Sequence, residues 1–272
     1  MTLLVQISDP HFGTERTPVV EALVRFVHAQ APAVAMLSGD ITQRARRKQF
    51  DAARAFIARL HVPTTLVIPG NHDIPLYNLA ARVAQPYAEF RRAFGRDMEP
   101  AFETEDMLLL TLNTTRPYLH EAGAVSRGQI ERVARRLERA TAGQLRIVVT
   151  HQPVSVTRSE DRADLLHGHA RAVRRWAGAG ADLILGGHIH LPFVQPLQGA
   201  RPGSRRTVWA VQAGTAVSSR VRSDAGNSVN LIRCAGPSIP RRCSVERWDY
   251  DTAADRFRLA ARNDLEFDDA AR

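Results

Sequence analysis

The sequence predicts an α/β fold, because buried strands and amphipathic helices alternate along its first half. Apolar runs at residues 3–7, 33–37 and 65–68 predict three short strands. Helical spacing of apolar residues separates these strands, which is typical of a parallel sheet. The 272 residues, 44% of them hydrophobic, are enough for one large α/β domain with a sizeable core.

The helices of this half are predicted from the period of their apolar residues. The segment 19–31 carries Val20, Leu23, Val24 and Val27 at helical spacing. Residues 47–60 have the same amphipathic pattern, and residues 76–94 form a mostly helical stretch interrupted near Pro86.

The order of elements changes after residue 100. A strand pair is expected at 101–105 and 107–112, and a helix at 126–139 begins with Ser126 as N-cap and Gln129 at the capping-box position. Strands at 146–149 and 182–185 enclose a polar segment, 158–168, which is a candidate lid, and a short helix at 170–177. Short antiparallel strands are then expected at 193–197, 207–213, 228–233, 244–249 and 256–259.

We expect one domain over residues 1–262, followed by an acidic, frayed tail over 263–272. No apolar stretch approaches the roughly 20 residues that span a bilayer. No basic and apolar leader is visible at the N-terminus, so a cytoplasmic location is the default expectation. The two cysteines, Cys234 and Cys243, flank a turn, and free thiols are expected in such a compartment.

The net charge of +9 is compatible with a nucleic-acid partner, but composition explains it more simply. Lys48 is the only lysine among the 37 basic residues, so the other 36 are arginines. Heavy use of Arg and Ala with almost no Lys is typical of a biased genome composition. Nucleic acid is therefore kept as the less favoured partner.

Five clusters of chemically active residues follow predicted strands, each after a sharp turn. Because carboxyl ends of parallel strands bind the ligands of open α/β sheets, all five could meet at one rim. They are Asp9-Pro10-His11, Gly39-Asp40, Gly70-Asn71-His72-Asp73, His151, and Gly187-His188-Ile189-His190.

The residue types in these clusters indicate a metal site. Asp9 with His11, and His188 with His190, have i, i+2 spacing, which in extended backbone directs both side chains to one side. Such a pair gives a metal two ligands from a few residues. Imidazole, carboxylate and amide donors suit Zn, Mn or Fe rather than Ca.

Each cluster alone has a simpler explanation. Asp-Pro-His and Gly-Asp are common turn sequences, and Asp73 could cap a helix. A single histidine such as His151 is more often a hydrogen-bonded core residue than a ligand. The ordered set of five, each behind a strand, is what makes the metal site the stronger hypothesis.

This motif series, D-x-H, G-D, G-N-H-D, H-x-P and G-H-x-H, closely resembles that of the calcineurin-like metallophosphoesterase superfamily. Leu112-Asn113-Thr114, Gly123, Gln129 and Ala213-Gly214-Thr215 resemble the bacterial branch that contains class III cyclic-nucleotide phosphodiesterases. The resemblance covers roughly residues 1–232.

The resemblance implies a four-layer α/β/β/α sandwich, in which two mixed sheets pack face to face with helices outside. It also implies two divalent or transition metal ions, Mn, Fe or Zn. The seven implied ligands are Asp9, His11 and His190 for the first ion, Asn71, His151 and His188 for the second, and Asp40 as a bridge. His72 would lie beside the metals without binding them.

Charge and acid–base chemistry agree with this assignment. Two divalent ions with Asp9, Asp40 and a bridging hydroxide leave about one positive charge, which suits a phosphate anion. The leaving oxygen then needs a proton, and His72 is the candidate acid. Asp73 either orients His72 or caps a helix, and the two roles have equal weight.

The sequence therefore predicts a metal-dependent phosphodiesterase. A metal-activated hydroxide would attack a small phosphodiester in line, with a 3',5'-cyclic nucleotide as the leading substrate class. The alternatives are a DNA or RNA nuclease of the same superfamily and a non-catalytic scaffold that retains the fold. We expect a small-molecule phosphoester as partner and no membrane span, and the sequence leaves a homodimer open.

Overall fold

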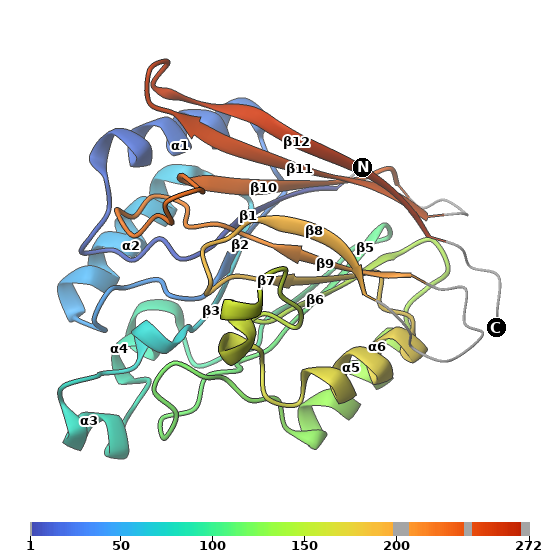
Figure 1. The fold of residues 1–272 in the computed structure, drawn as a ribbon, viewed down its shortest axis with the longest axis horizontal. Helices are drawn as coiled ribbons and strands as arrows, with labels where there is room; N and C mark the ends of the chain where they lie inside the picture. Colours follow the sequence, from blue (N-terminus) through green and yellow to red (C-terminus); the bar gives the residue numbers. More distant parts are fainter. Residues whose placement is uncertain (1, 198–206, 237–240, 268–272) are drawn as a thin grey trace.

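The computed structural model describes residues 2–197, 207–236 and 241–267, which form two six-stranded mixed sheets (Figure 1). The first sheet has the order β12-β11-β10-β1-β2-β3. Its strands β1 to β3 are parallel, and β10 to β12 continue the sheet antiparallel beside β1. The bounds are Leu3–Ile7 for β1, Val34–Ser38 for β2, Thr64–Ile68 for β3, Ser228–Cys234 for β10, Arg241–Asp251 for β11 and Arg256–Phe267 for β12.

The second sheet has the order β4-β5-β6-β7-β9-β8. Four neighbouring strands in it are parallel, while β4 and β8 are antiparallel edge strands. The bounds are Ala101–Glu103 for β4, Met107–Thr111 for β5, Leu145–Val149 for β6, Leu183–Gly186 for β7, Phe193–Leu197 for β8 and Val208–Gln212 for β9.

Helices cover the outer face of each sheet, so the predicted four layers are confirmed. Val5 and Ile7 of β1 pack toward the helices of the first sheet, whereas Leu4 packs between the sheets with Leu109 of β5. This alternation follows from the two-residue period of a strand that is buried on both faces. The first sheet carries α1 (Thr17–Gln30), α2 (Arg47–Leu60) and α4 (Ala88–Phe94), and the second carries α5 (Arg127–Glu138) and α6 (His169–Ala179).

The local helix predictions also hold. The stretch 76–94 divides into α3 (Leu79–Ala84) and α4, with Pro86 between them. At the start of α5, the backbone N–H of Gln129 donates to the Ser126 hydroxyl, and the Gln129 side chain accepts from the Ser126 N–H. These reciprocal bonds are the predicted capping box.

The prediction of a frayed tail is wrong for residues 263–267. Strand β12 continues through residues 263–267 and pairs with β11, and Leu265 and Phe267 are buried. The acidic residues alternate with these apolar ones on the opposite face, where Glu266 forms an ion pair with Arg242 at 2.8 Å. Residues 268–272 of the predicted tail lie outside the described residues.

The two cysteines are cross-strand neighbours. Cys234 of β10 lies opposite Cys243 of β11, and both are buried as free thiols. Within the described ranges, no helix has the length and apolar character needed to cross a membrane.

Candidate metal centre

The five sequence clusters meet at one rim of the molecule, as the strand positions predict. Each follows the carboxyl end of a parallel strand: β1, β2 and β3 in one sheet, β6 and β7 in the other. Gln6 helps to hold the two sheets together near this rim, because its side-chain amide donates to Ser38 of β2 and to the Gly186 carbonyl of β7. The rim is thus built from both sheets.

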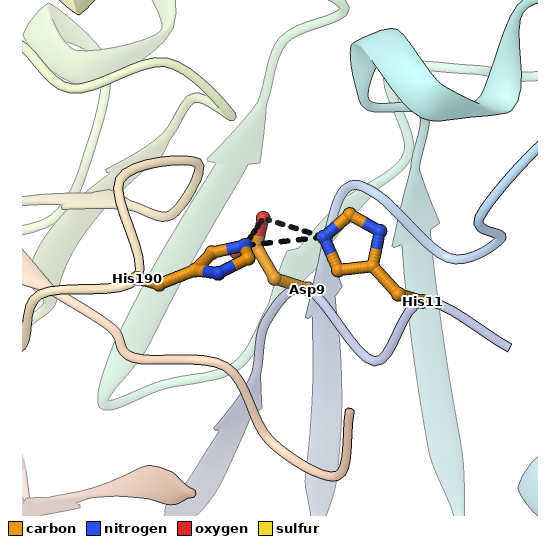
Figure 2. A group of neighbouring side chains, drawn as sticks. All are labelled: Asp9, His11 and His190. Carbon is orange, nitrogen blue, oxygen red and sulfur yellow. Dashed lines mark hydrogen bonds and ion pairs between the residues drawn. The ribbon is translucent and has the colours of Figure 1, made fainter. Parts of the chain in front are cut away.

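The first group of potential ligands is Asp9, His11 and His190, drawn in Figure 2. The Nε2 atoms of the two imidazoles face each other at 3.1 Å, and the His190 Nε2 lies 3.3 Å from Oδ1 of Asp9. All three side chains are buried. They come from the loop after β1 and from the loop after β7, so the two sheets must pack correctly before the group exists.

The second group is Asp40, His151 and His188. Nε2 of His151 lies 3.3 Å from Oδ1 of Asp40 and 3.2 Å from Oδ1 of Asn71. The rings of His151 and His188 are 5.2 Å apart. The amide oxygen of Asn71 thus lies beside this group.

Asp40 contacts both groups with different oxygens. Its Oδ1 lies near His151 of the second group, and its Oδ2 lies 3.6 Å from Nε2 of His11 in the first. The carboxylate also accepts a hydrogen bond from the His72 backbone N–H at 2.9 Å. A single buried carboxylate therefore stands between two ligand sets, where a bridging ligand has to be.

The backbone at the ligands is not extended, which corrects the sequence argument. Five candidate ligands have left-handed backbone, with φ values of 51° at Asp9, 44° at His11, 50° at Asp40, 73° at His188 and 54° at His190. Left-handed residues other than glycine are uncommon and strained, and they gather at functional sites. The i, i+2 pairs accordingly behave differently: Asp9 and His11 share one group, whereas His188 and His190 point to different groups.

Two motif glycines are needed because the loops approach each other closely. A Cβ at Gly70 would overlap the backbone nitrogen and carboxylate of Asp40, and one at Gly187 would overlap Ser8 and the carboxylate of Asp9. In both cases the glycine of one cluster makes room for a ligand of another.

Charge is distributed unevenly among the buried groups. Burial raises the pKa of Asp9, but His190 lowers it more, to about 2. Burial lowers the pKa of His11 to about 3, against the opposing effect of Asp40. Burial also lowers the pKa of His151, but the Asp40 carboxylate outweighs this and raises it to about 9. The carboxylates of Asp9 and Asp40 are thus ionised, and Asp40 favours a positive charge on or beside the His151 ring.

The donor atoms present fit a metal. The Nδ1 atoms of His151 and His190 lie 2.9 and 2.6 Å from the backbone carbonyls of Ser38 and Arg220. Carbonyls only accept, so each Nδ1 carries a hydrogen, and loss of the proton on Nε2 would leave a lone pair directed into the group. The Nδ1 of His188 is buried and has no hydrogen-bond partner in the described part of the chain. Lone pairs therefore converge on two points that a cation can fill.

His72 lies beside these groups, with its ring centroid 4.8 Å from that of His11. Its Nδ1 is 2.9 Å from the Gln43 carbonyl, which fixes the ring. Asp73 does not orient the His72 ring. Its buried carboxylate instead accepts hydrogen bonds from the backbone N–H groups of Gly70, Ile41 and Thr42 at 2.8–3.0 Å.

Asp73 therefore ties the loop after β3 to the loop after β2, which corrects its predicted catalytic role. Burial and the nearby Asp40 carboxylate raise the pKa of Asp73 to about 7, while its three backbone donors act in the opposite direction. The alternative, a capping role, is closer to the structure. Asp73 accepts a hydrogen bond from the backbone N–H of Gly70, the residue just before the short 3-10 helix Asn71–Asp73.

Three residues at the site carry no sequence signal. Gln43 and Arg220 contact His72, and Oδ1 of Asp164, from the candidate lid, lies 3.5 Å from Nε2 of His188. Gln43 and Arg220 lie in loops of no recognisable motif, Asp164 ends a short 3-10 helix, and only the packing of distant segments brings the three to the rim. The lid segment itself contains a 3-10 helix, Ser159–Asp164.

Two face-to-face mixed sheets with a rim of Asp, His and Asn side chains define a metallophosphoesterase type of architecture. The chain belongs to the calcineurin-like phosphoesterase family, whose model matches residues 2–192. The family implies a metal-dependent phosphoesterase, and its members typically bind two divalent metals. A comparison with curated protein sequences found no match.

Solved structures share the fold at low sequence identity. A purple acid phosphatase, PPD1, from yellow lupin seeds aligns over 98% of this chain with a TM-score of 0.74 and 11% identity. This chain spans only 54% of the lupin protein. A dimetal phosphatase from Danio rerio aligns over 98% of this chain and 99% of its own, with a TM-score of 0.66 and 11% identity. TT1561 of Thermus thermophilus aligns over 95% and 98%, with a TM-score of 0.55 and 14% identity.

Proposed function

We propose that the protein is a two-metal phosphodiesterase that hydrolyses a small phosphodiester such as a 3',5'-cyclic nucleotide. The position of Asp40 carries this proposal, because its two oxygens lie 3.3 and 3.6 Å from histidines of two different ligand groups. A carboxylate so placed can hold two ions close together. When bound, such ions supply an activated water nucleophile and a Lewis-acid clamp on the phosphoryl oxygens.

The ligands would divide between the ions as the family resemblance implies. Asp40 would bridge, and the other six form two sets of three: Asp9, His11 and His190, then Asn71, His151 and His188. Two carboxylates, four neutral imidazoles and one amide leave a positive centre around divalent ions, which attracts a phosphate anion. Mn, Fe and Zn all suit these donors.

His72 would protonate the leaving oxygen. The Gln43 carbonyl holds its Nδ1, so that the other nitrogen, Nε2, is directed away from this anchor. His72 also lines a cavity of about 300 Å³ together with Asn71, a proposed ligand. A substituent leaving from a phosphoryl group on the metals could occupy this cavity while Nε2 of the imidazolium form, in which both ring nitrogens carry hydrogen, donates its proton and leaves the neutral ring.

The cavity is also the feature that favours a diester over a monoester substrate. A second ester group needs room beside the phosphoryl group, and the cavity supplies it next to the proposed acid. The resemblance of Leu112-Asn113-Thr114 and Ala213-Gly214-Thr215 to the cyclic-nucleotide branch supports the same choice. The net charge of +9 keeps a nuclease as the second candidate.

The test is a substrate panel with metal-loaded protein. We expect two bound ions per chain, and faster turnover of bis(p-nitrophenyl) phosphate than of p-nitrophenyl phosphate. Protein that binds two ions but turns over neither ester would favour a scaffold. A comparison of 3',5'-cyclic AMP with single-stranded DNA then separates the two enzyme candidates, and hydrolysis of DNA alone would overturn the small-substrate proposal.

A further inference from the structure

Arg220 is attached to the candidate metal centre through its backbone. Its carbonyl accepts a hydrogen bond from Nδ1 of His190 at 2.6 Å, and its N–H donates to the Ser218 hydroxyl at 3.1 Å. The residue thus holds a proposed metal ligand on one side. Its side chain starts from a fixed point at the rim of the site.

The guanidinium of Arg220 lies against two neutral acceptors. Its Nη1 is 2.9 Å from Nε2 of His72 and 3.3 Å from the Gln43 side-chain oxygen. Because Nδ1 of His72 is bonded to a carbonyl, Nε2 accepts in the neutral ring, and Arg220 donates to it. This side chain therefore covers the nitrogen that faces the proposed leaving group.

The charge environment of Arg220 differs from that of the nearby Arg222. Among the described residues, no carboxylate oxygen lies within 4 Å of the Arg220 guanidinium, although Arg222, two positions on, pairs with Asp161 at 2.8 Å and Glu160 at 3.1 Å. An arginine that is held in place without an acidic partner keeps its full attraction for an anion.

Arg220 also borders the cavity beside the proposed ligands. The cavity of about 300 Å³ is lined by Asn71, His72 and Arg220, among others. A phosphoryl group on the metals with its leaving group in this cavity would lie within reach of the guanidinium. The phosphoryl oxygens are anionic, so they are stronger acceptors than the imidazole and amide that Arg220 contacts now.

We propose that Arg220 is a substrate-binding residue that moves from His72 to a non-bridging phosphoryl oxygen when substrate binds. This inference rests on the proposed phosphoesterase function and adds a phosphate contact to it. The movement exchanges two neutral acceptors for a charged one. It also uncovers Nε2 of His72, so that phosphate binding and the exposure of this nitrogen are coupled.

The test measures the binding of inorganic phosphate by calorimetry, with both metal sites loaded. Arg220→Gln should weaken phosphate binding by about 10- to 100-fold, the range expected for a hydrogen bond to a charged group. Arg220→Lys should fall between this variant and the parent, because it keeps the charge without the two-pronged geometry. Metal content and thermal unfolding, measured alongside, check that each variant keeps the site and the fold.

Arg127→Gln is the control for the loss of one positive charge, because Arg127 is exposed at the start of α5 and does not line the cavity. We expect its phosphate affinity to stay within about threefold of the parent. Loss of affinity equal to that of Arg220→Gln would overturn the proposal, as would a parent that binds no phosphate or an Arg220→Gln variant that binds it normally. Phosphate binding does not require turnover, so the calorimetric result can be interpreted even if the protein hydrolyses no diester.

Discussion

Gly70 and Asp40 are packed so closely that a Cβ at position 70 would overlap the backbone nitrogen and the carboxylate of Asp40. Gly70 begins the loop that carries Asn71 and His72, and Asp40 is the proposed bridge. The glycine is therefore a requirement of the metal site rather than of the turn alone, since its φ of −103° is open to other residues.

Gly70→Ala should lower the content of both metal ions together, because Asp40 must shift to make room. We expect the content of both ions to fall in protein purified with excess metal, as measured by elemental analysis. Gly178→Ala is the control for the same substitution. A Cβ at Gly178, inside helix α6, would meet no neighbouring atom within 4 Å, so this change should be neutral or stabilise by about 0.5–1 kcal/mol. Full metal content in Gly70→Ala would contradict the packing argument.

Substitution of Asp40 should affect both ions, whereas substitution of His11 should affect mainly one. Asp40→Ala removes the carboxylate whose two oxygens approach both ligand groups, and His11→Ala leaves the second group intact. Metal stoichiometry after dialysis, with turnover measured in parallel, distinguishes the two outcomes. An Asp40→Ala protein with two tightly bound ions and normal turnover would exclude the bridging role.

His72→Ala should lose activity in a way that depends on the leaving group. An alkoxide leaving group needs a proton, so an alkyl phosphodiester should lose most of the roughly 10²–10⁴-fold that general acid catalysis contributes. A nitrophenyl diester needs little help and should lose much less, with metal content unchanged. Equal losses on the two substrates would mean that His72 only binds phosphate or shapes the loop.

Asp73→Asn provides the comparison for this experiment. The amide can accept with only one oxygen, so its NH₂ group would face backbone N–H donors of Ile41 and Gly70. We expect a loss of stability of about 2–4 kcal/mol, read from denaturant unfolding. Any loss of activity should be similar for the alkyl and nitrophenyl diesters, because Asp73 contacts the loop and not the His72 ring.

Metal binding near His151 should release a proton at neutral pH. Burial lowers the pKa of His151 in the metal-free protein, but Asp40 raises it more, to about 9. The ring must lose that proton to bind a metal, so affinity should rise about tenfold per pH unit up to pH 9. Calorimetry in buffers of different ionisation enthalpy measures the release, which His151→Ala should reduce.

The same shift fixes the sign of the stability change in the metal-free protein. Because the pKa of His151 is higher in the folded protein than in the unfolded chain, protonation of this ring stabilises the folded state. The stabilisation is complete below the unfolded-state pKa of 6.5 and is lost as the pH rises through about 9. Metal-free protein should therefore become less stable between these two pH values. Stability that is constant or increases across this range would argue against the Asp40–His151 pair.

Much of the fold and the site could be predicted from local sequence, because strand, turn and ligand follow one another along the chain. The apolar run before Gly70-Asn71-His72-Asp73 is one example, and β3 ends directly before this motif. The end of the domain was harder to predict. Leu265 and Phe267 alternate with acidic residues, and only pairing with β11 turns that segment into a strand.

What the sequence could not reveal depends on distant segments. Arg220 reaches His72, which is 148 positions away, and no motif surrounds it. Asp73 stands next to a candidate acid in the sequence, yet its carboxylate turns toward the loop after β2. The position of Asp73 next to His72 in the sequence therefore suggested a contact between their side chains, whereas in the folded protein Asp73 bonds to the loop after β2.

The left-handed backbone at Asp9, His11, Asp40, His188 and His190 restricts how this rim can change during evolution or engineering. Asp, Asn and His tolerate that conformation better than most residues with a side chain. The backbone thus selects among ligands before any metal does: a cysteine or glutamate placed at these five positions would carry an added conformational cost. Redesign for a softer metal should therefore begin at Asn71 or His151, whose backbone lies outside the left-handed region.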